Sequence, residues 1–369
     1  MADENGDRRS PVGGHFPLFK KHPQLQDAIP FVSLGSYPTP VEELTELSEK
    51  FDCRLWVKRD DMTSPLYGGN KVRKLEFMIA EALENHYDRI IVYGGYGSHQ
   101  VLAAAIYGLR AGLEVTALLF PQPLTDHCIN NLRALAGLGV TMRHVKPREM
   151  LPAAIIRERI AAIPTMQRAS TMPPGGSSPL TCLGYVNAVY ELKEQIARGE
   201  APKPDVIIVA LGSCGTMAGL VTGAALAKLK ADIIGVRVVD HLFSNTVQVA
   251  HLCNETVKLM KKTGCRVRLR RFAPWKMSII HDQYGGEYGL PTKKAEEAVS
   301  VFGGQGIKLE TTYTAKAAAA LLAALRSGRL RGKNVLFWNT YAGTDISPLA
   351  EAGPTKENLP PPFNGLGRS

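Results

Sequence analysis

Cysteine is scarce in this sequence, and its cysteines stand far apart. The six are Cys53, Cys128, Cys182, Cys214, Cys253 and Cys265. No two of them form a Cys-x-x-Cys pair, and a chain of 369 residues can bury a core without disulfides. The sequence also lacks His-Glu-x-x-His and other paired metal-ligand spacings. We therefore expect buried, reduced thiols, no metal site and a cytoplasmic location.

Long apolar stretches are missing as well. No apolar run reaches the ~18 residues that a membrane span needs. Residues 1–9 are polar and lead into no apolar signal segment, so we expect neither a secretory signal nor a membrane partner. The first 30 residues hold four prolines and predict an irregular arm. The Pro-rich segment 359–365 excludes a helix or a central strand there.

Acidic residues are too few to balance the basic ones, with 34 against 44 and a net charge of +10. Such a charge suits nucleic acid, a membrane surface or an acidic small substrate. The densest basic stretch runs from Lys258 to Lys276, and Arg266–Arg270 alternates like a strand with one basic face. A charged edge strand explains that pattern too, and no recognition motif accompanies it. Nucleic-acid binding without catalysis is therefore a remote alternative, and we expect no nucleic-acid partner.

What the sequence does contain is a regular alternation of short apolar strands and helices. The predicted strands cover residues 54–58, 89–93, 114–120, 140–145, 205–211, 232–239 and 333–338. The helices predicted between the early strands cover residues 71–84, 100–111 and 126–138, with Asn70 as an N-cap. This order predicts an α/β fold of open, twisted parallel sheets with helices on both faces.

Three glycine-rich loops stand at strand–helix or loop–helix junctions. Gly68-Gly69-Asn70-Lys71 places a lysine where a helix dipole favours anions, which a bound phosphate or conversion of the amine to an imine would resolve. Residues 209–219 run from a buried strand through small residues into a helix, as an anion cradle does, and residues 94–100 could receive a carboxylate. Each loop read alone could equally be a tight turn.

The joint occurrence of these segments resembles a known family. The chain is similar to fold type II, tryptophan-synthase-like, pyridoxal phosphate enzymes from about Pro38 to Leu349. Within them it looks most like the branch of D-cysteine desulfhydrase and 1-aminocyclopropane-1-carboxylate deaminase. The segments that carry the resemblance are Gly68-Gly69-Asn70-Lys71-Val72-Arg73-Lys74-Leu75-Glu76, Gly286-Glu287-Tyr288-Gly289-Leu290-Pro291-Thr292 and Tyr313-Thr314-Ala315-Lys316-Ala317.

The resemblance implies pyridoxal 5'-phosphate as the cofactor and names its ligands. Lys71 would bind the cofactor as an imine and serve as the base for the Cα proton, and Lys74 would reach the phosphate. Thr314 and Thr340 would lie at the pyridine nitrogen. The phosphate-binding loop would comprise Gly212, Ser213, Cys214, Gly215 and Thr216.

The resemblance also implies the substrate site. Ser98, with the amides near His99 and Gln100, would bind the substrate carboxylate and help to move a proton. Tyr288 and Tyr313 would flank a small amino-acid substrate and hydrogen-bond it or transfer a proton. We therefore predict Lys71, Ser98, Tyr288 and Tyr313 as catalytic residues.

Four positions bear on the reaction. His99 replaces an asparagine that contacts the phenolic oxygen of the cofactor in the family, and could still donate a hydrogen bond. Cys214 replaces a glycine, and Tyr341 enters a segment that resembles His-Thr-Gly-Gly elsewhere. The cyclopropane-opening deaminases carry glutamate where this chain has Thr314. A hydroxyl should leave the pyridine nitrogen largely neutral, which favours the desulfhydrase side.

These points predict a lyase that performs α,β-elimination on an amino acid such as D-cysteine, giving pyruvate, ammonia and sulfide. Alternatives on the same scaffold are a 1-aminocyclopropane-1-carboxylate deaminase, an L-cysteate sulfo-lyase and a biosynthetic β-replacement enzyme. The large cofactor domain would comprise residues 1–73 and 181–369, and the small domain residues 74–180, with the site in the cleft between them. The resemblance implies a homodimer.

Overall fold

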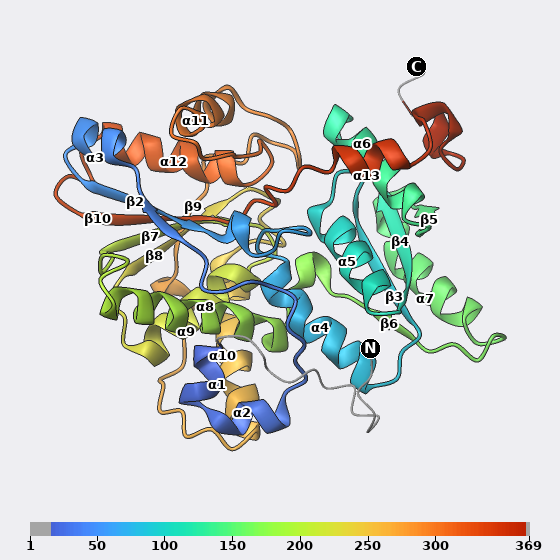
Figure 1. The fold of residues 1–369 in the computed structure, drawn as a ribbon, viewed down its shortest axis with the longest axis horizontal. Helices are drawn as coiled ribbons and strands as arrows, with labels where there is room; N and C mark the ends of the chain where they lie inside the picture. The colour runs from blue at the N-terminus through green and yellow to red at the C-terminus, as the bar shows by residue number, and fades with distance from the viewer. Residues whose placement is uncertain (1–15, 367–369) are drawn as a thin grey trace.

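The strands form two separate sheets in the computed structural model, which describes residues 16–366. The larger sheet has the order β1-β2-β10-β7-β8-β9, and the smaller has the order β5-β4-β3-β6. Neighbouring strands run parallel except β1 and β2. Figure 1 shows each sheet with its own helices, which confirms the predicted α/β fold of two parallel-sheet lobes.

The larger sheet is covered by helices on both faces (Figure 1). Its strands are β1 (Val41–Glu43), β2 (Arg54–Arg59), β7 (Val206–Leu211), β8 (Asp232–Arg237), β9 (Ser278–Ile280) and β10 (Asn334–Asn339). Strand β7 is buried along its whole length, as its unbroken apolar sequence predicts. Its alternate residues belong to two different hydrophobic clusters. One includes α8 (Pro179–Ala197), α9 (Gly215–Ala227) and α10 (Thr246–Lys262), and the other α3 (Thr45–Phe51), α11 (Lys293–Gly303) and α12 (Thr314–Arg326).

The smaller sheet lies between two further helix layers. Its strands are β3 (Arg89–Gly95), β4 (Glu114–Phe120), β5 (Thr141–His144) and β6 (Ala169–Thr171). Its main cluster includes α4 (Val72–Glu84), α5 (His99–Arg110) and α6 (Asp126–Gly137), while α7 (Leu151–Ala161) covers the other face. After β10 the chain crosses to this lobe, where α13 (Ser347–Ala352) packs on α6 (Figure 1). The division into domains at residues 73 and 181 stays a prediction.

Two local expectations about the basic stretch and the arm are wrong. Residues 266–270 form no strand: they follow α10 as irregular chain, in which Val267 is buried and Arg266 and Arg268 are exposed. The arm contains α1 (Pro17–Lys21) and α2 (Pro23–Ala28), each with proline at its first position, where the missing N–H costs nothing. Residues 1–15 of the predicted arm lie outside the described residues.

Short 3₁₀ turns complete the fold. They are η1 (Asp60–Met62), η2 (Arg148–Met150), η3 (Pro174–Gly176), η4 (Pro274–Lys276), η5 (Lys356–Asn358) and η6 (Phe363–Gly365). Within residues 16–366, no helix has the length and apolar character needed to cross a membrane. All six cysteines are buried and unpaired, as expected.

Candidate active site

A cavity of about 740 Å³ lies where residues of both lobes meet. Parallel strands β3, β7 and β10 end beside it, so their following loops converge there. The predicted site residues that line it are Lys71, Lys74, Ser98, His99, Gln100, Gly212, Ser213, Cys214, Thr216, Tyr288, Tyr313, Thr314 and Thr340. Gly215, the remaining predicted residue, is the first residue of α9 at the same loop.

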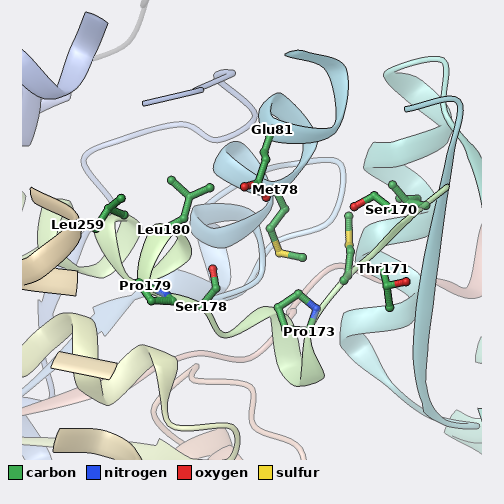
Figure 2. Close-up of a pocket in the computed structure, with 11 residues that line it drawn as sticks. Met78, Glu81, Ser170, Thr171, Pro173, Ser178, Pro179, Leu180 and Leu259 are labelled. Carbon is green, nitrogen blue, oxygen red and sulfur yellow. The ribbon is translucent and has the colours of Figure 1, made fainter. Parts of the chain in front are cut away.

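A second cavity of about 270 Å³ lies behind the loop of residues 173–178 (Figure 2). Met78 and Glu81 of α4, Thr171 and Leu259 contribute to its wall. It contains none of the predicted site residues. The larger cavity is therefore the candidate active site.

Two lysines of the larger cavity share one acceptor. The Nζ atoms of Lys71 and Lys74 donate to the carbonyl oxygen of Gly175 over 3.3 and 3.1 Å. Burial, and then the charge of Lys74, hold the pKa of Lys71 well below its usual value. Burial lowers the pKa of Lys74 to about 8. Lys71 is thus suited to act as a neutral nucleophile and base, and Lys74 as the adjacent cation.

The loop after β7 forms a cradle at the start of α9. Cys214 adopts the left-handed conformation, with φ 67° and ψ −22°, and Gly215 begins the helix. Ser177 accepts a hydrogen bond from the Gly215 amide at 3.2 Å and lies 2.7 Å from the Ser213 hydroxyl. Lys74 donates to the Ser177 hydroxyl at 3.0 Å. A left-handed residue before a helix start turns backbone amides toward one point, which suits an anion.

Glycine is required at Gly215 by close packing. A Cβ there would lie 2.4 Å from the Ser177 Oγ and 3.1 Å from the Lys74 Nζ. The cradle is therefore a space bounded by hydroxyls, amides and one cation. These groups match the acceptor oxygens and the charge of a phosphate.

The prediction that Asn70 caps α4 is wrong. Lys71 occupies the N-cap position, and no side chain caps the helix. Asn70 instead donates from Nδ2 to the Thr216 hydroxyl at 3.2 Å, while its amide donates to the Thr340 carbonyl at 3.2 Å. Asn70 thus ties the lysine loop to the cradle.

The start of α5 forms another wall of the cavity. Ser98 is the N-cap, and its Oγ accepts from the Val101 amide at 3.4 Å. A helix start with free amides suits a carboxylate. The Gln100 side chain turns toward Met172, and its buried Oε1 has no hydrogen-bond partner. The carboxylate-binding role of the backbone amides near His99 and Gln100 stays a prediction.

His99 lies in an aromatic cluster. Its Nδ1 is 2.8 Å from the Tyr67 hydroxyl, and its ring centroid is 4.8 Å from that of His127 and 5.7 Å from that of Tyr341. Burial, followed by the neighbouring His127 and Lys71, holds the pKa of His99 well below its usual value. His99 is therefore neutral at physiological pH and can present one N–H.

Tyr288 and Tyr313 meet inside the cavity, with 2.7 Å between their hydroxyl oxygens. Burial raises the pKa of Tyr288 to about 12 and that of Tyr313 well above its usual value. Both are thus protonated at neutral pH. The pair can hold or pass a proton.

Several residues that line the cavity or contact its lining were not predicted from the sequence. Glu310 accepts the Thr314 amide at 2.7 Å, and Arg148 stacks over Phe120 and Phe243 at 4.7 and 5.2 Å to the ring centroids. Ser177 and Tyr67 contact predicted residues as described above. The small-residue run of residues 173–178 before α8 was the one sequence signal that could have indicated Ser177.

The donor set fits pyridoxal phosphate. The cradle of the Ser213 and Ser177 hydroxyls, the start of α9 and Lys74 suits its phosphate, and the Gly215 clash shows that this cradle has no room for a larger residue. The amine of Lys71, which burial keeps neutral, suits its aldehyde.

The fold and the cavity define a two-lobed α/β protein in which a cradle of hydroxyls and backbone amides lies beside two lysines. The chain belongs to the family of pyridoxal-phosphate dependent enzymes, whose family model matches residues 32–340. It is an enzyme of the lyase type that uses this cofactor.

Relatives in this family carry two names. A Thermotoga maritima protein provisionally named as a 1-aminocyclopropane-1-carboxylate deaminase is 32% identical over 319 residues, covering 84% of this chain and 95% of the relative. The D-cysteine desulfhydrase of Klebsiella pneumoniae subsp. pneumoniae is 32% identical over 318 residues, covering 84% and 93%.

Comparison with solved structures gives the same fold. The crystal structure of a 1-aminocyclopropane-1-carboxylate (ACC) deaminase homologue superimposes with a TM-score of 0.74 at 27% identity, covering 92% of this chain and 99% of the other. A threonine deaminase from Solanum lycopersicum has a TM-score of 0.59 at 17% identity, covering 93% and 94%, and shows the shared fold alone. The fold is that of the fold type II enzymes.

Proposed function

We propose that this chain eliminates a β substituent from a small amino acid such as D-cysteine, with water entering and pyruvate, ammonia and sulfide leaving. The observation that carries the proposal is Lys71: a largely neutral amine beside the cationic Lys74 in a closed cradle. A neutral amine is what removal of the Cα proton requires near neutral pH.

Each cofactor-binding residue has a proposed role. Bound pyridoxal phosphate supplies an electron sink that makes the Cα proton acidic. Lys74, Ser177 and residues 212–216 would hold the phosphate group, and Thr314 and Thr340 would bind the ring nitrogen. Neutral His99, oriented by Tyr67, would donate its N–H to the cofactor's phenolic oxygen.

Substrate contacts form the other half of the site. The free amides at the start of α5 and the Ser98 hydroxyl bind the substrate carboxylate, which orients the Cα proton toward Lys71. The pair formed by Tyr288 and Tyr313 holds a proton that it can give to the departing group. These groups line one cavity, so the base, the carboxylate site and the proton donor face the same substrate.

A second candidate is deamination of 1-aminocyclopropane-1-carboxylate, with water entering and 2-oxobutyrate and ammonia leaving. It is equally supported, because relatives of both names match this chain at 32% identity. Both reactions use a base, a carboxylate site and a proton donor. L-Cysteate and β-replacement substrates are further alternatives on the same residues.

The test combines a spectrum with product analysis. Purified protein incubated with pyridoxal phosphate should show the visible band of a lysine-bound cofactor, and Lys71→Ala should lack it. Lys258→Ala, which removes an exposed lysine paired with Glu255, is the matched control and should keep the band. No band in the unmodified protein would overturn the proposal.

Products then separate the candidates. Pyruvate with sulfide from D-cysteine supports elimination, and 2-oxobutyrate from the cyclopropane supports deamination. Pyruvate with sulfite from L-cysteate, or a new amino acid from added nucleophiles, would replace both. The homodimer and the cytoplasmic location stay predictions.

A further inference from the structure

Glu310 lines the cavity just before α12 begins. Its carboxylate, however, accepts hydrogen bonds from backbone amides. Its two oxygens accept the amides of Thr312 at 2.8 Å, Tyr313 at 2.9 Å and Thr314 at 2.7 Å. Among residues 16–366, no lysine, arginine or histidine forms an ion pair with it. The nearby cation Lys316 donates instead to the Tyr284 carbonyl at 2.7 Å. Hydrogen-bond donors thus hold the Glu310 carboxylate, and Lys316 acts on it only through its charge, without a direct contact.

One of these donors is the hydroxyl of Thr314, a residue that is 1% exposed. Its Oγ1 lies 3.1 Å from the Glu310 Oε1 and 3.4 Å from the Glu310 carbonyl oxygen. A carboxylate and a carbonyl can only accept, so the single hydroxyl proton is directed at Glu310. The same Oγ1 accepts the Glu310 amide at 3.1 Å, which uses one lone pair.

One lone pair of the Thr314 hydroxyl therefore remains for the cavity. A free hydroxyl can donate or accept, but this one can offer only an acceptor, and a negative charge stands behind it. Turning its proton away from Glu310 would give up a hydrogen bond to an ion, which is about twice as strong as a neutral one. A ring nitrogen that contacts the Thr314 hydroxyl therefore meets an acceptor, and it forms a hydrogen bond with that hydroxyl only when it carries the proton itself.

We propose that Glu310 is a positioning residue that acts through the Thr314 hydroxyl to keep the ring nitrogen of the bound cofactor protonated. The inference rests on the proposed function, which assigns the ring nitrogen to Thr314. It reverses the expectation that a hydroxyl at residue 314 leaves this nitrogen neutral. A protonated ring is the stronger electron sink, so the chain has the sink that opening of a cyclopropane requires.

The decisive measurement is the resonance of the ring nitrogen in protein loaded with ¹⁵N-labelled pyridoxal phosphate. We expect the protonated position at pH 7 to 8 in the unmodified protein and in Thr314→Ser, which keeps the hydroxyl. Thr314→Val keeps the shape of the side chain and the hydrogen bonds from backbone amides to the Glu310 carboxylate. The ring-nitrogen resonance of this variant should therefore shift to the unprotonated position. Glu310→Gln, if it folds, should shift in the same direction.

Two outcomes overturn the inference without touching the proposed function. They are a bound cofactor whose ring nitrogen is unprotonated in the unmodified protein, and a protonated nitrogen that Thr314→Val leaves unchanged. Protein that takes up no cofactor, with no visible band, overturns the proposed function and this inference with it.

Discussion

The hydroxyl oxygens of Tyr288 and Tyr313 lie 2.7 Å apart, so one of these tyrosines donates its proton to the other. Burial raises the pKa of Tyr288 to about 12 and that of Tyr313 well above its usual value, which keeps both protons in place at neutral pH. Their ring planes meet edge to face at 73°, with centroids 6.1 Å apart. The two side chains should therefore work as one unit.

Replacing either tyrosine by phenylalanine should lower kcat for elimination by about 10²–10⁴-fold, the range of general acid–base catalysis. The double variant should lose little more than the worse single variant, because residues that act as a unit are not additive. Steady-state kinetics check this, with the visible cofactor spectrum as a test of folding. Tyr190→Phe, whose hydroxyl is 3.0 Å from the His22 Nε2, is the control. Multiplicative losses in the double variant would show two independent roles instead.

Lys74 should make phosphate binding depend on pH. Burial lowers its pKa to about 8, so its amine is cationic below that pH and loses its charge above it. Affinity of the cofactor-free protein for inorganic phosphate should therefore fall as pH rises through 8, by up to about tenfold for each further pH unit. Titration calorimetry between pH 7 and 9.5 measures this. Lys74→Arg keeps its charge throughout and should bind with a flatter profile. Identical pH profiles for the unmodified protein and Lys74→Arg would contradict the assignment of Lys74 to the phosphate.

The buried strand β7 and the common direction of the two lysines were predictable from local sequence. Residues 205–211 are apolar on both faces, which happens where helices cover a parallel strand on both sides, and the structure buries all of β7. Lys71 and Lys74 stand one helical turn apart, so their common direction could be inferred from spacing alone. Their shared acceptor Gly175, about one hundred residues away, leaves no such local signal.

The missed and the misassigned residues depend on side-chain orientation and on competing partners. Glu310 resembles a helix-capping acid in sequence, and its link to the cavity depends on the rotamer of Thr314. Asn70 matches an N-cap pattern, but the competing hydroxyl of Thr216 takes its side chain. Arg266–Arg270 alternates as a strand would, yet it pairs with no strand among residues 16–366, and Val267 is buried in irregular chain. Pattern alone cannot detect such competition.

The backbone conformation of Cys214 should make the protein less stable than it would be with glycine at this position. Its φ of 67° is left-handed, which costs a residue with a Cβ roughly 1–2 kcal/mol. Cys214→Gly and Cys214→Ala both lose the thiol contact to the Phe243 carbonyl at 3.6 Å, but only glycine escapes the backbone cost. The glycine variant should therefore have the higher free energy of unfolding, by about 1 kcal/mol.

Chemical denaturation of the two variants measures this difference, and Cys253 provides the control. It lies inside α10, where glycine is about 1 kcal/mol worse than alanine, so the order of the two variants should reverse. The same order at both positions would mean that the left-handed backbone of Cys214 carries no cost.

Glu76 lies on α4, two residues after Lys74, and it is 1% exposed. Its Oε1 accepts the amides of Leu34 and Gly35, each at 3.2 Å, and its Oε2 accepts the Tyr37 hydroxyl at 3.2 Å. These bonds oppose the cost of burial without cancelling it, and the pKa of Glu76 is raised to about 7. Burial thus favours the protonated carboxyl group more strongly than the three accepted hydrogen bonds favour the ionised one.

The contribution of Glu76 to the free energy of unfolding should therefore fall as the pH rises. Because the folded pKa lies above the unfolded value of 4.5, the contribution of Glu76 is complete below 4.5 and is lost as pH rises through 7. Glu76→Gln cannot ionise, so its free energy of unfolding relative to the unmodified protein should increase by up to about 3 kcal/mol between pH 4 and 8. Denaturant titrations at several pH values measure this difference. Glu84→Gln, an exposed change on the same helix, should show almost none of it. A difference for Glu76→Gln that stays constant with pH would mean that Glu76 is equally ionised in the folded and unfolded chains.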